Sequence, residues 1–245
     1  MVSIDNPLFW LLAISGVILT GISKSGFAGG AGVVAVPLLA LVMPVQHAAA
    51  LILPLLLVMD VKTVLLYRQA IHFRDIKAIG LAALIGIAIA GSAMASLSSD
   101  TLQLALALFC ILFASWQQLM PLLGKLPGSA YLWGTLSGIS STLLHAGGPP
   151  ISIYFLSKGL SKKVWLAQAS VFFALMNLVK VIPYSLNDVW QLEFFLIDLV
   201  LFPVAVIGVY LGHIIQGYLA EASFTLSCRI LLGITGSLLL VKILL

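Results

Sequence analysis

The chain has 245 residues and a formal net charge of +4, and 62% of its residues are hydrophobic whereas only 8% are charged. Soluble domains carry about 25% charged residues, so this composition excludes a water-soluble globular protein. Lysine and arginine are not clustered with aromatic residues as they are in nucleic-acid-binding proteins. The positive charge is therefore interpreted as a topology signal, and no nucleic acid is expected as a partner.

Ten apolar stretches follow one another along the chain, bounded by charged residues, glycine or proline: 7–23, 30–44, 47–67, 76–97, 101–121, 130–145, 148–157, 164–184, 194–217 and 224–244. Helices are expected throughout, because lipid offers backbone groups no other partner. A crossing takes about 20 apolar residues, so 30–44, 130–145 and 148–157 are too short to span comfortably. The predicted fold class is all-α, a polytopic integral membrane protein with about 8–10 transmembrane or re-entrant helices.

The second part of the chain repeats the first. The segment 134-GTLSGISSTLLHAGGPPISIYFL-156 aligns with 16-GVILTGISKSGFAGGAGVVAVPLL-39, which places Gly21 on Gly138. Further along, Asp60 falls on Asn177 and Gly86 on Gly208. We therefore predict two membrane repeats, a plan common among transporters. The first repeat spans residues 1–121, a cytoplasmic linker spans 122–129, and the second repeat spans 130–245.

Charged loops predict the orientation of these repeats. Cytoplasmic loops collect lysine and arginine, and such residues occur at Arg68, Arg74, Lys77, Lys125, Lys158, Lys162 and Lys163. The loop 185–193, which corresponds to the Arg68–Lys77 loop, contains Asp188 and Glu193 and no basic residue. Equivalent loops thus lie on opposite sides, so the repeats are inverted and both termini are expected outside a bacterial inner membrane. The same parity holds whether the short segments cross or re-enter.

Both repeats contain a helix break rich in glycine, at 21-GISKSGFAGGAG-32 and 138-GISSTLLHAGGPP-150. Interrupted segments at corresponding positions of inverted halves indicate a transporter binding site, and the free N–H groups of a broken helix suit an anion. Lys24 adds a full positive charge to the first break and is the leading substrate contact; alternatively, it is only a topology signal. The predicted substrate-binding residues are Ser23, Lys24, Ser25, Gly29, Gly30, Ser141, Thr142, His145, Gly147, Gly148 and Gln168.

Further polar residues inside the apolar runs are candidates for coupling. Asp60 and Asn177 occupy equivalent repeat positions, with Lys62 and Lys180 close in sequence. Asp60, Asn177 and Lys180 are expected to form a polar network, either a structural pairing or a site for a coupling proton or sodium ion. His145 is either a structural histidine or a group that donates to an anion or binds a proton. No metal or cofactor is expected, because neither cysteine lies in a metal-ligand spacing.

At these breaks the sequence resembles the TauE/SafE sulfite exporter family, also called the toluene sulfonate uptake permease family. The segments 26-GFAGGAGVVAVPLL-39 and 146-AGGPPISIYFLSKGLS-161 carry the resemblance. It implies a small duplicated membrane transporter that moves, and in most cases exports, sulfite, thiosulfate, sulfoacetate or a related sulfonate. Lys24 departs from the more uniformly small or apolar break of many relatives, which indicates either a substrate that needs a fixed positive partner or a coupling role peculiar to this member.

The expected function is a secondary transporter of a small sulfur-containing anion, with alternating access around the two breaks and a possible homo-oligomer in the lipid bilayer. One alternative is a transporter or channel for another small anion, such as a carboxylate. A weaker alternative is an intramembrane hydrolase in which Lys24 activates Ser23 or Ser25.

Overall fold

A computed structural model describes residues 6–27, 34–115, 129–218 and 220–244. The described residues form ten α-helices and one short 3-10 helix, with no strand among them. Their bounds are α1 Pro7–Gly26, α2 Ala35–Ala40, α3 Val45–Tyr67, η1 Arg68–Ala70, α4 Phe73–Met94, α5 Ser99–Ala114, α7 Ala130–Leu144, α8 Gly148–Ser157, α9 Lys162–Leu186, α10 Leu192–Ile215 and α11 Glu221–Leu244. The prediction of an all-helical polytopic membrane protein is confirmed.

Six of the described helices are long and apolar enough to cross a membrane: α1, α3, α4, α9, α10 and α11. The segment 101–121, predicted to span, overlaps the 16-residue helix α5, which begins two residues earlier and ends at Ala114; residues 116–121 lie outside the described residues. In the predicted stretch 30–44, the described residues 34–44 include one helix, the six-residue α2. The short helices α7 and α8 agree with the predicted stretches 130–145 and 148–157 to within one residue.

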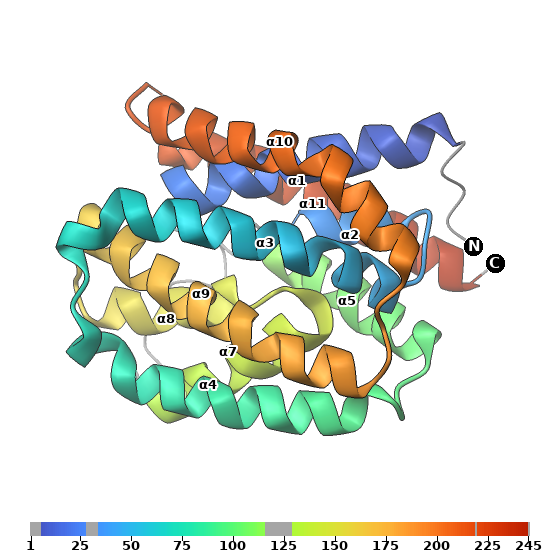
Figure 1. Ribbon diagram of the computed structural model, residues 1–245, viewed down its shortest axis with the longest axis horizontal. Helices are drawn as coiled ribbons and strands as arrows, with labels where there is room; N and C mark the ends of the chain where they lie inside the picture. The colour runs from blue at the N-terminus through green and yellow to red at the C-terminus, as the bar shows by residue number, and fades with distance from the viewer. Residues whose placement is uncertain (1–5, 28–33, 116–128, 219, 245) are drawn as a thin grey trace.

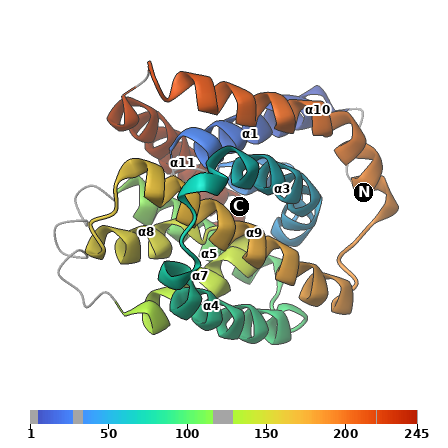
Figure 2. The same ribbon diagram turned by 60° about the vertical axis from the view of Figure 1, so that its left-hand side comes forward.

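The helices are arranged in two outer groups with α3 and α9 between them (Figures 1 and 2). Helix α1 packs along α10, and α7 packs along α4. Helices α3 and α9 pack against each other, while α3 also contacts α10 and α9 contacts α4. Helices from the first half of the chain are therefore paired with helices from the second half, and neither half is a separate body.

Glycines make the two outer pairings possible. A Cβ atom at Gly21 would lie 2.8 Å from the backbone carbon of Gly208 in α10, and one at Gly138 would lie 2.3 Å from the carbonyl oxygen of Ala83 and 3.0 Å from Cα of Gly86 in α4. Only glycine lets backbones approach this closely, as at many helix contacts in membranes. The repeat alignment makes these contacts equivalent, since Gly21 corresponds to Gly138 and Gly208 to Gly86.

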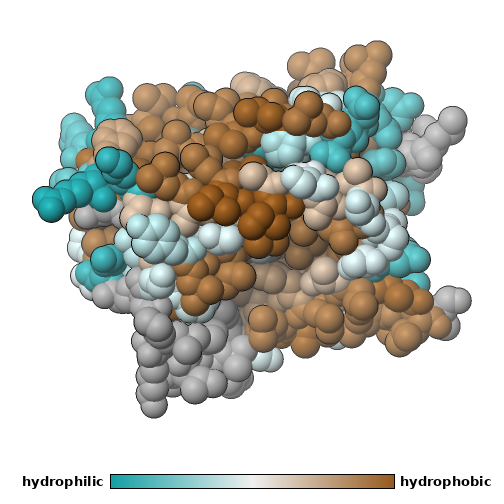
Figure 3. Space-filling view, turned by 90° about the horizontal axis from the view of Figure 1, so that it is seen from below, coloured by the Kyte–Doolittle hydropathy of each residue, from teal (hydrophilic) through white to brown (hydrophobic). Residues whose placement is uncertain are grey.

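The outer surface of the helix bundle is apolar. Large side chains such as Leu199 on α10 and Leu186 on α9 are 72% and 78% exposed. Figure 3 shows apolar side chains over the middle of one face, while polar side chains gather mostly toward two opposite ends. Water would penalise so much exposed apolar surface, whereas hydrocarbon does not. The surface therefore fits a bilayer, in agreement with the composition.

Candidate functional site

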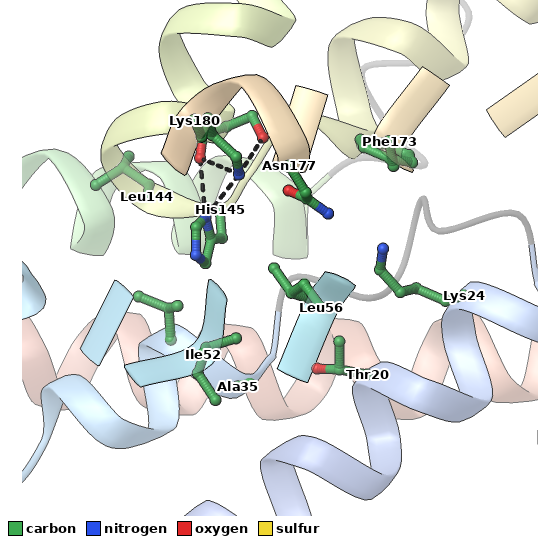
Figure 4. A pocket seen from close by; sticks show the side chains of 13 residues that line it. Thr20, Lys24, Ala35, Ile52, Leu56, Leu144, His145, Phe173, Asn177 and Lys180 are labelled. Carbon is green, nitrogen blue, oxygen red and sulfur yellow. Dashed lines mark hydrogen bonds between the residues drawn. The ribbon is translucent and has the colours of Figure 1, made fainter. Parts of the chain in front are cut away.

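A small cavity lies where the two halves of the chain meet, between α1, α2, α3, α7, α8 and α9. Its volume is about 40 Å³, which holds about three water molecules. Figure 4 shows Lys180, His145 and Asn177 on one side of the cavity and Lys24 and Thr20 on the other. The cavity is thus lined by positively charged and hydrogen-bonding groups set among apolar side chains.

Lys24, near the end of α1, forms a salt bridge with Asp60 on α3, and both side chains are mostly buried. The other carboxylate oxygen of Asp60 accepts a hydrogen bond from the side-chain amide of Asn177 on α9. The ammonium of Lys24 also lies 5.5 Å from the ring centre of Phe173. The structure therefore brings Asp60 and Asn177 together, and the lysine paired with Asp60 is Lys24. Lys62, which is close to Asp60 in sequence, is exposed.

Lys180 is fully buried on α9, and its contacts are with uncharged groups. Its ammonium nitrogen Nζ donates to the carbonyl oxygen of Ser141 at 3.1 Å and to the hydroxyl oxygen of Ser141 at 3.0 Å. It also lies 3.0 Å from Nδ1 of His145. Within the described part of the chain, the Lys24–Asp60 pair is the only salt bridge, so Lys180 has no carboxylate partner there.

His145 is held in an unusual backbone conformation at the end of α7. Its φ of 53° and ψ of 30° lie in the left-handed region, which costs a non-glycine residue about 1–2 kcal/mol. Its ring nitrogen Nε2 lies 2.9 Å from the carbonyl oxygen of Ala49, and Nδ1 lies 3.0 Å both from the carbonyl oxygen of Ser141 and from Nζ of Lys180. Because Lys180 can donate to Nδ1 whereas the Ala49 carbonyl can only accept, we assign the proton to Nε2. Nδ1 then accepts from Lys180. Both ring nitrogens are used, and His145 positions Lys180 instead of offering a free donor.

Several predicted site residues do not line the cavity. The hydroxyl of Ser25 donates to the carbonyl oxygens of Gly21 and Val209, and that of Thr142 donates to Gly138. Gly147 packs against Ser137 and Ser141. Ser23 and Gln168 are buried without hydrogen-bond partners and are absent from the lining. Gly29 and Gly30 lie outside the described residues.

Ser23, Ser25 and Lys24 also bear on the hydrolase alternative. The ammonium of Lys24 is paired with Asp60, and neither serine hydroxyl is hydrogen-bonded to it. A lysine that activates a serine has to lie within hydrogen-bond reach of its hydroxyl. The arrangement of these three side chains therefore does not favour a Ser–Lys pair.

Gly148, at the start of α8, lines the cavity as predicted. The free N–H groups at this helix end are fewer than the break implied, because Pro149 and Pro150 carry no N–H. Among the described residues, the second break thus supplies little backbone donation.

The sequence interpretation missed several lining residues, among them Thr20, Leu56 and Phe173. Each precedes a polar residue of the site network by four positions: Thr20 precedes Lys24, and Phe173 precedes Asn177. Residues four apart share one helix face. Helical spacing from the predicted polar residues was thus the signal that pointed to them.

Two hydrogen bonds outside the cavity repeat the same geometry in both halves. The phenol of Tyr67 donates to the carbonyl oxygen of Ser25, and that of Tyr184 donates to the carbonyl oxygen of Thr142 at 2.7 Å. In each half, a tyrosine near the C-terminal end of α3 or α9 donates to the residue that follows Lys24 or Ser141. These bonds tie each broken helix to α3 or α9.

Comparison with known families identifies one match. The family model described as "Sulfite exporter TauE/SafE" matches residues 12–239, nearly the whole chain. Neither the curated proteins nor the solved structures that were searched gave a match.

Proposed function

Because the chain belongs to the TauE/SafE sulfite exporter family, a family of membrane transporters, we propose that it carries a small sulfur-containing oxyanion out of the cell through the cavity between Lys24 and Lys180. The observation that carries this proposal is the charge of the cavity. Two lysines reach it, and Asp60 balances only Lys24. A bound anion supplies the charge that Lys180 lacks.

The volume of the cavity supports a small substrate. A space for about three waters corresponds to about 90 Å³ of liquid. That is enough for an inorganic oxyanion with three or four heavy atoms around sulfur, such as sulfite or thiosulfate. A larger sulfonate such as taurine needs a wider conformation, so inorganic sulfur oxyanions are the favoured substrates.

The pairing of helices supports the two inverted repeats, 1–121 and 130–245. The contact of Gly21 with Gly208 is repeated by that of Gly138 with Gly86, and the equivalent residues Asp60 and Asn177 bond to each other. This is the pattern of a two-fold axis that passes between α3 and α9. In alternating access, the moving bodies would then be the α1–α10 and α4–α7 pairs, each with a helix from both repeats.

The charged ends of the bundle support the proposed orientation. The turns that carry Arg68, Arg74 and the Lys162–Lys163 pair lie at the end of the bundle opposite the two chain termini (Figure 1). The positive-inside rule places these basic turns in the cytoplasm. Both termini would then lie outside an inner membrane.

Thermal unfolding of the purified protein with a panel of anions tests the proposal. The panel contains sulfite, thiosulfate, sulfoacetate, taurine, phosphate and acetate, and a ligand at 100 times its Kd stabilises the folded state by about 2.7 kcal/mol. We expect sulfite or thiosulfate to raise Tm, and Lys180→Met to abolish the shift. Lys62→Met, at an exposed lysine two residues from Asp60, is the matched control. A shift with acetate alone would favour a carboxylate transporter, and no shift with any anion would overturn the proposal.

A further inference from the structure

Lys180 is a fully buried lysine with no oppositely charged partner among the described residues. Its side chain is fully buried, and its three polar neighbours are the carbonyl and hydroxyl oxygens of Ser141 and Nδ1 of His145. An unpaired charge in a low-dielectric interior is so unfavourable that the group usually becomes neutral instead. When no anion is bound, these surroundings therefore disfavour the ammonium form of Lys180.

The surrounding titratable groups do not remove this penalty. Asp60 on α3 already pairs with Lys24 through one oxygen and accepts from Asn177 through the other. Lys24 on α1 is itself a basic residue, and His145, directly after α7, is neutral in the tautomer assigned above. Tyr184, one turn further along α9, donates its phenol proton to Thr142. None of these groups offers Lys180 a negative charge without giving up its present partner.

The hydrogen bonds of Lys180 fit both protonation states. An ammonium donates three N–H bonds, to the two oxygens of Ser141 and to His145. A neutral amine donates two, to the carbonyl oxygen and to His145, and accepts the third from the hydroxyl of Ser141, which can rotate. The change of protonation state thus needs no rearrangement of the backbone.

From these contacts we infer that Lys180 is the proton-binding group of transport: its amine is neutral in the empty cavity and takes up one proton together with each anion. The inference rests on the proposed function, since the anion in the cavity supplies the missing negative charge. One proton moves from solvent to Nζ as the anion binds and leaves when it is released. A monovalent anion and its proton then cross with no net charge, whereas the thiosulfate dianion and its proton move one net negative charge per cycle.

Proton uptake on thiosulfate binding tests this directly. Thiosulfate stays a dianion from pH 6 to 9, so any proton taken up goes to the protein. Unbuffered, detergent-solubilised protein is held at constant pH while thiosulfate is added, and the acid consumed is compared with the thiosulfate bound. We expect one proton per anion, and an affinity that falls about tenfold for each unit of rising pH where free Lys180 is neutral.

Two variants assign the proton to Lys180. Lys180→Arg keeps a permanent charge, so it should bind thiosulfate without proton uptake and with an affinity that does not change with pH. His145→Gln removes the other titratable group in contact with Lys180 and should still take up a proton. The exposed Lys62→Arg is the matched control for the lysine-to-arginine change and should behave like the wild type.

The outcomes separate this inference from the proposed function. Thiosulfate binding without proton uptake would overturn the inference and leave the anion site standing. Proton uptake that persists in Lys180→Arg would assign the proton to a group other than Lys180, whether or not His145→Gln abolishes the uptake. If Lys180→Arg does not bind thiosulfate, Lys180→Gln is measured instead, because its side chain is neutral. Thiosulfate binding by Lys180→Gln with the uptake of one proton would contradict the inference. No binding to the wild type would overturn both proposals.

Discussion

The close approach of α4 and α7 makes Gly138→Ala a severe test of the helix arrangement. The added Cβ would lie 2.3 Å from the carbonyl oxygen of Ala83 and 3.0 Å from both Cα of Gly86 and N of Ile87. All three are backbone atoms, so no side chain can turn away, and the helices must separate by about 1 Å to reach ordinary contact distances. Overpacking typically costs about 1–3 kcal/mol, and we expect the upper end of that range.

The assay is thermal unfolding in detergent, followed by the loss of helical circular dichroism. For a chain of this size, about 3 kcal/mol lowers Tm by about 6–12 °C. Gly80→Ala on the same helix pair is the matched control: a Cβ there meets no atom within 4 Å, and alanine favours a helix by about 1 kcal/mol over glycine. A Tm for Gly138→Ala within about 2 °C of the Gly80→Ala value, which corresponds to a difference in stability of about 1 kcal/mol or less, would refute the packing argument.

Three further predictions concern buried polar groups. Lys24→Met leaves Asp60 without its cation and should destabilise the folded protein by about 3 kcal/mol. The double variant Lys24→Met/Asp60→Leu should recover most of this loss, and additive losses from the two substitutions would contradict the pairing. Asp198 is buried and neither carboxyl oxygen has a hydrogen-bond partner, so Asp198→Leu should raise stability by about 1–3 kcal/mol, and a lower Tm would contradict this. Tyr67→Phe and Tyr184→Phe should each cost about 1 kcal/mol, and losses that differ several-fold would speak against equivalent roles in two repeats.

The sequence predicted the helices because their apolar runs and the charged or glycine-rich boundaries are local features. The extents of α7 and α8 were predicted to within one residue. The pairing of α1 with α10 and of α4 with α7 was not predicted, although Gly21, Gly86, Gly138 and Gly208 had all been aligned between the repeats. A repeat alignment identifies equivalent positions, and only the structure shows which of them contact one another.

Only some of the cavity lining could be predicted from the sequence. Lys24, singled out for its position in a broken helix, lines the cavity, but its pairing with Asp60 depends on a contact between two residues that are 36 positions apart in sequence. Lys180 was predicted to belong to a polar network and was not predicted to line the same cavity as Ser141, because its distance from the break in sequence gave no sign that α9 packs onto Ser141. Ser25 and Thr142 are short polar residues near the breaks, yet their hydroxyls donate to backbone carbonyl oxygens of the same helix or of a neighbouring helix.

Transport by the reconstituted protein tests the central claim, that an anion crosses through the cavity beside Lys180. Liposomes containing the protein are loaded with radiolabelled thiosulfate, and efflux is followed for the wild type, Lys180→Met and the exposed control Lys62→Met. We expect efflux from the wild type and the control, and a reduction of at least about tenfold in Lys180→Met, equivalent to 1.4 kcal/mol. Wild-type efflux from folded Lys180→Met would contradict the claim.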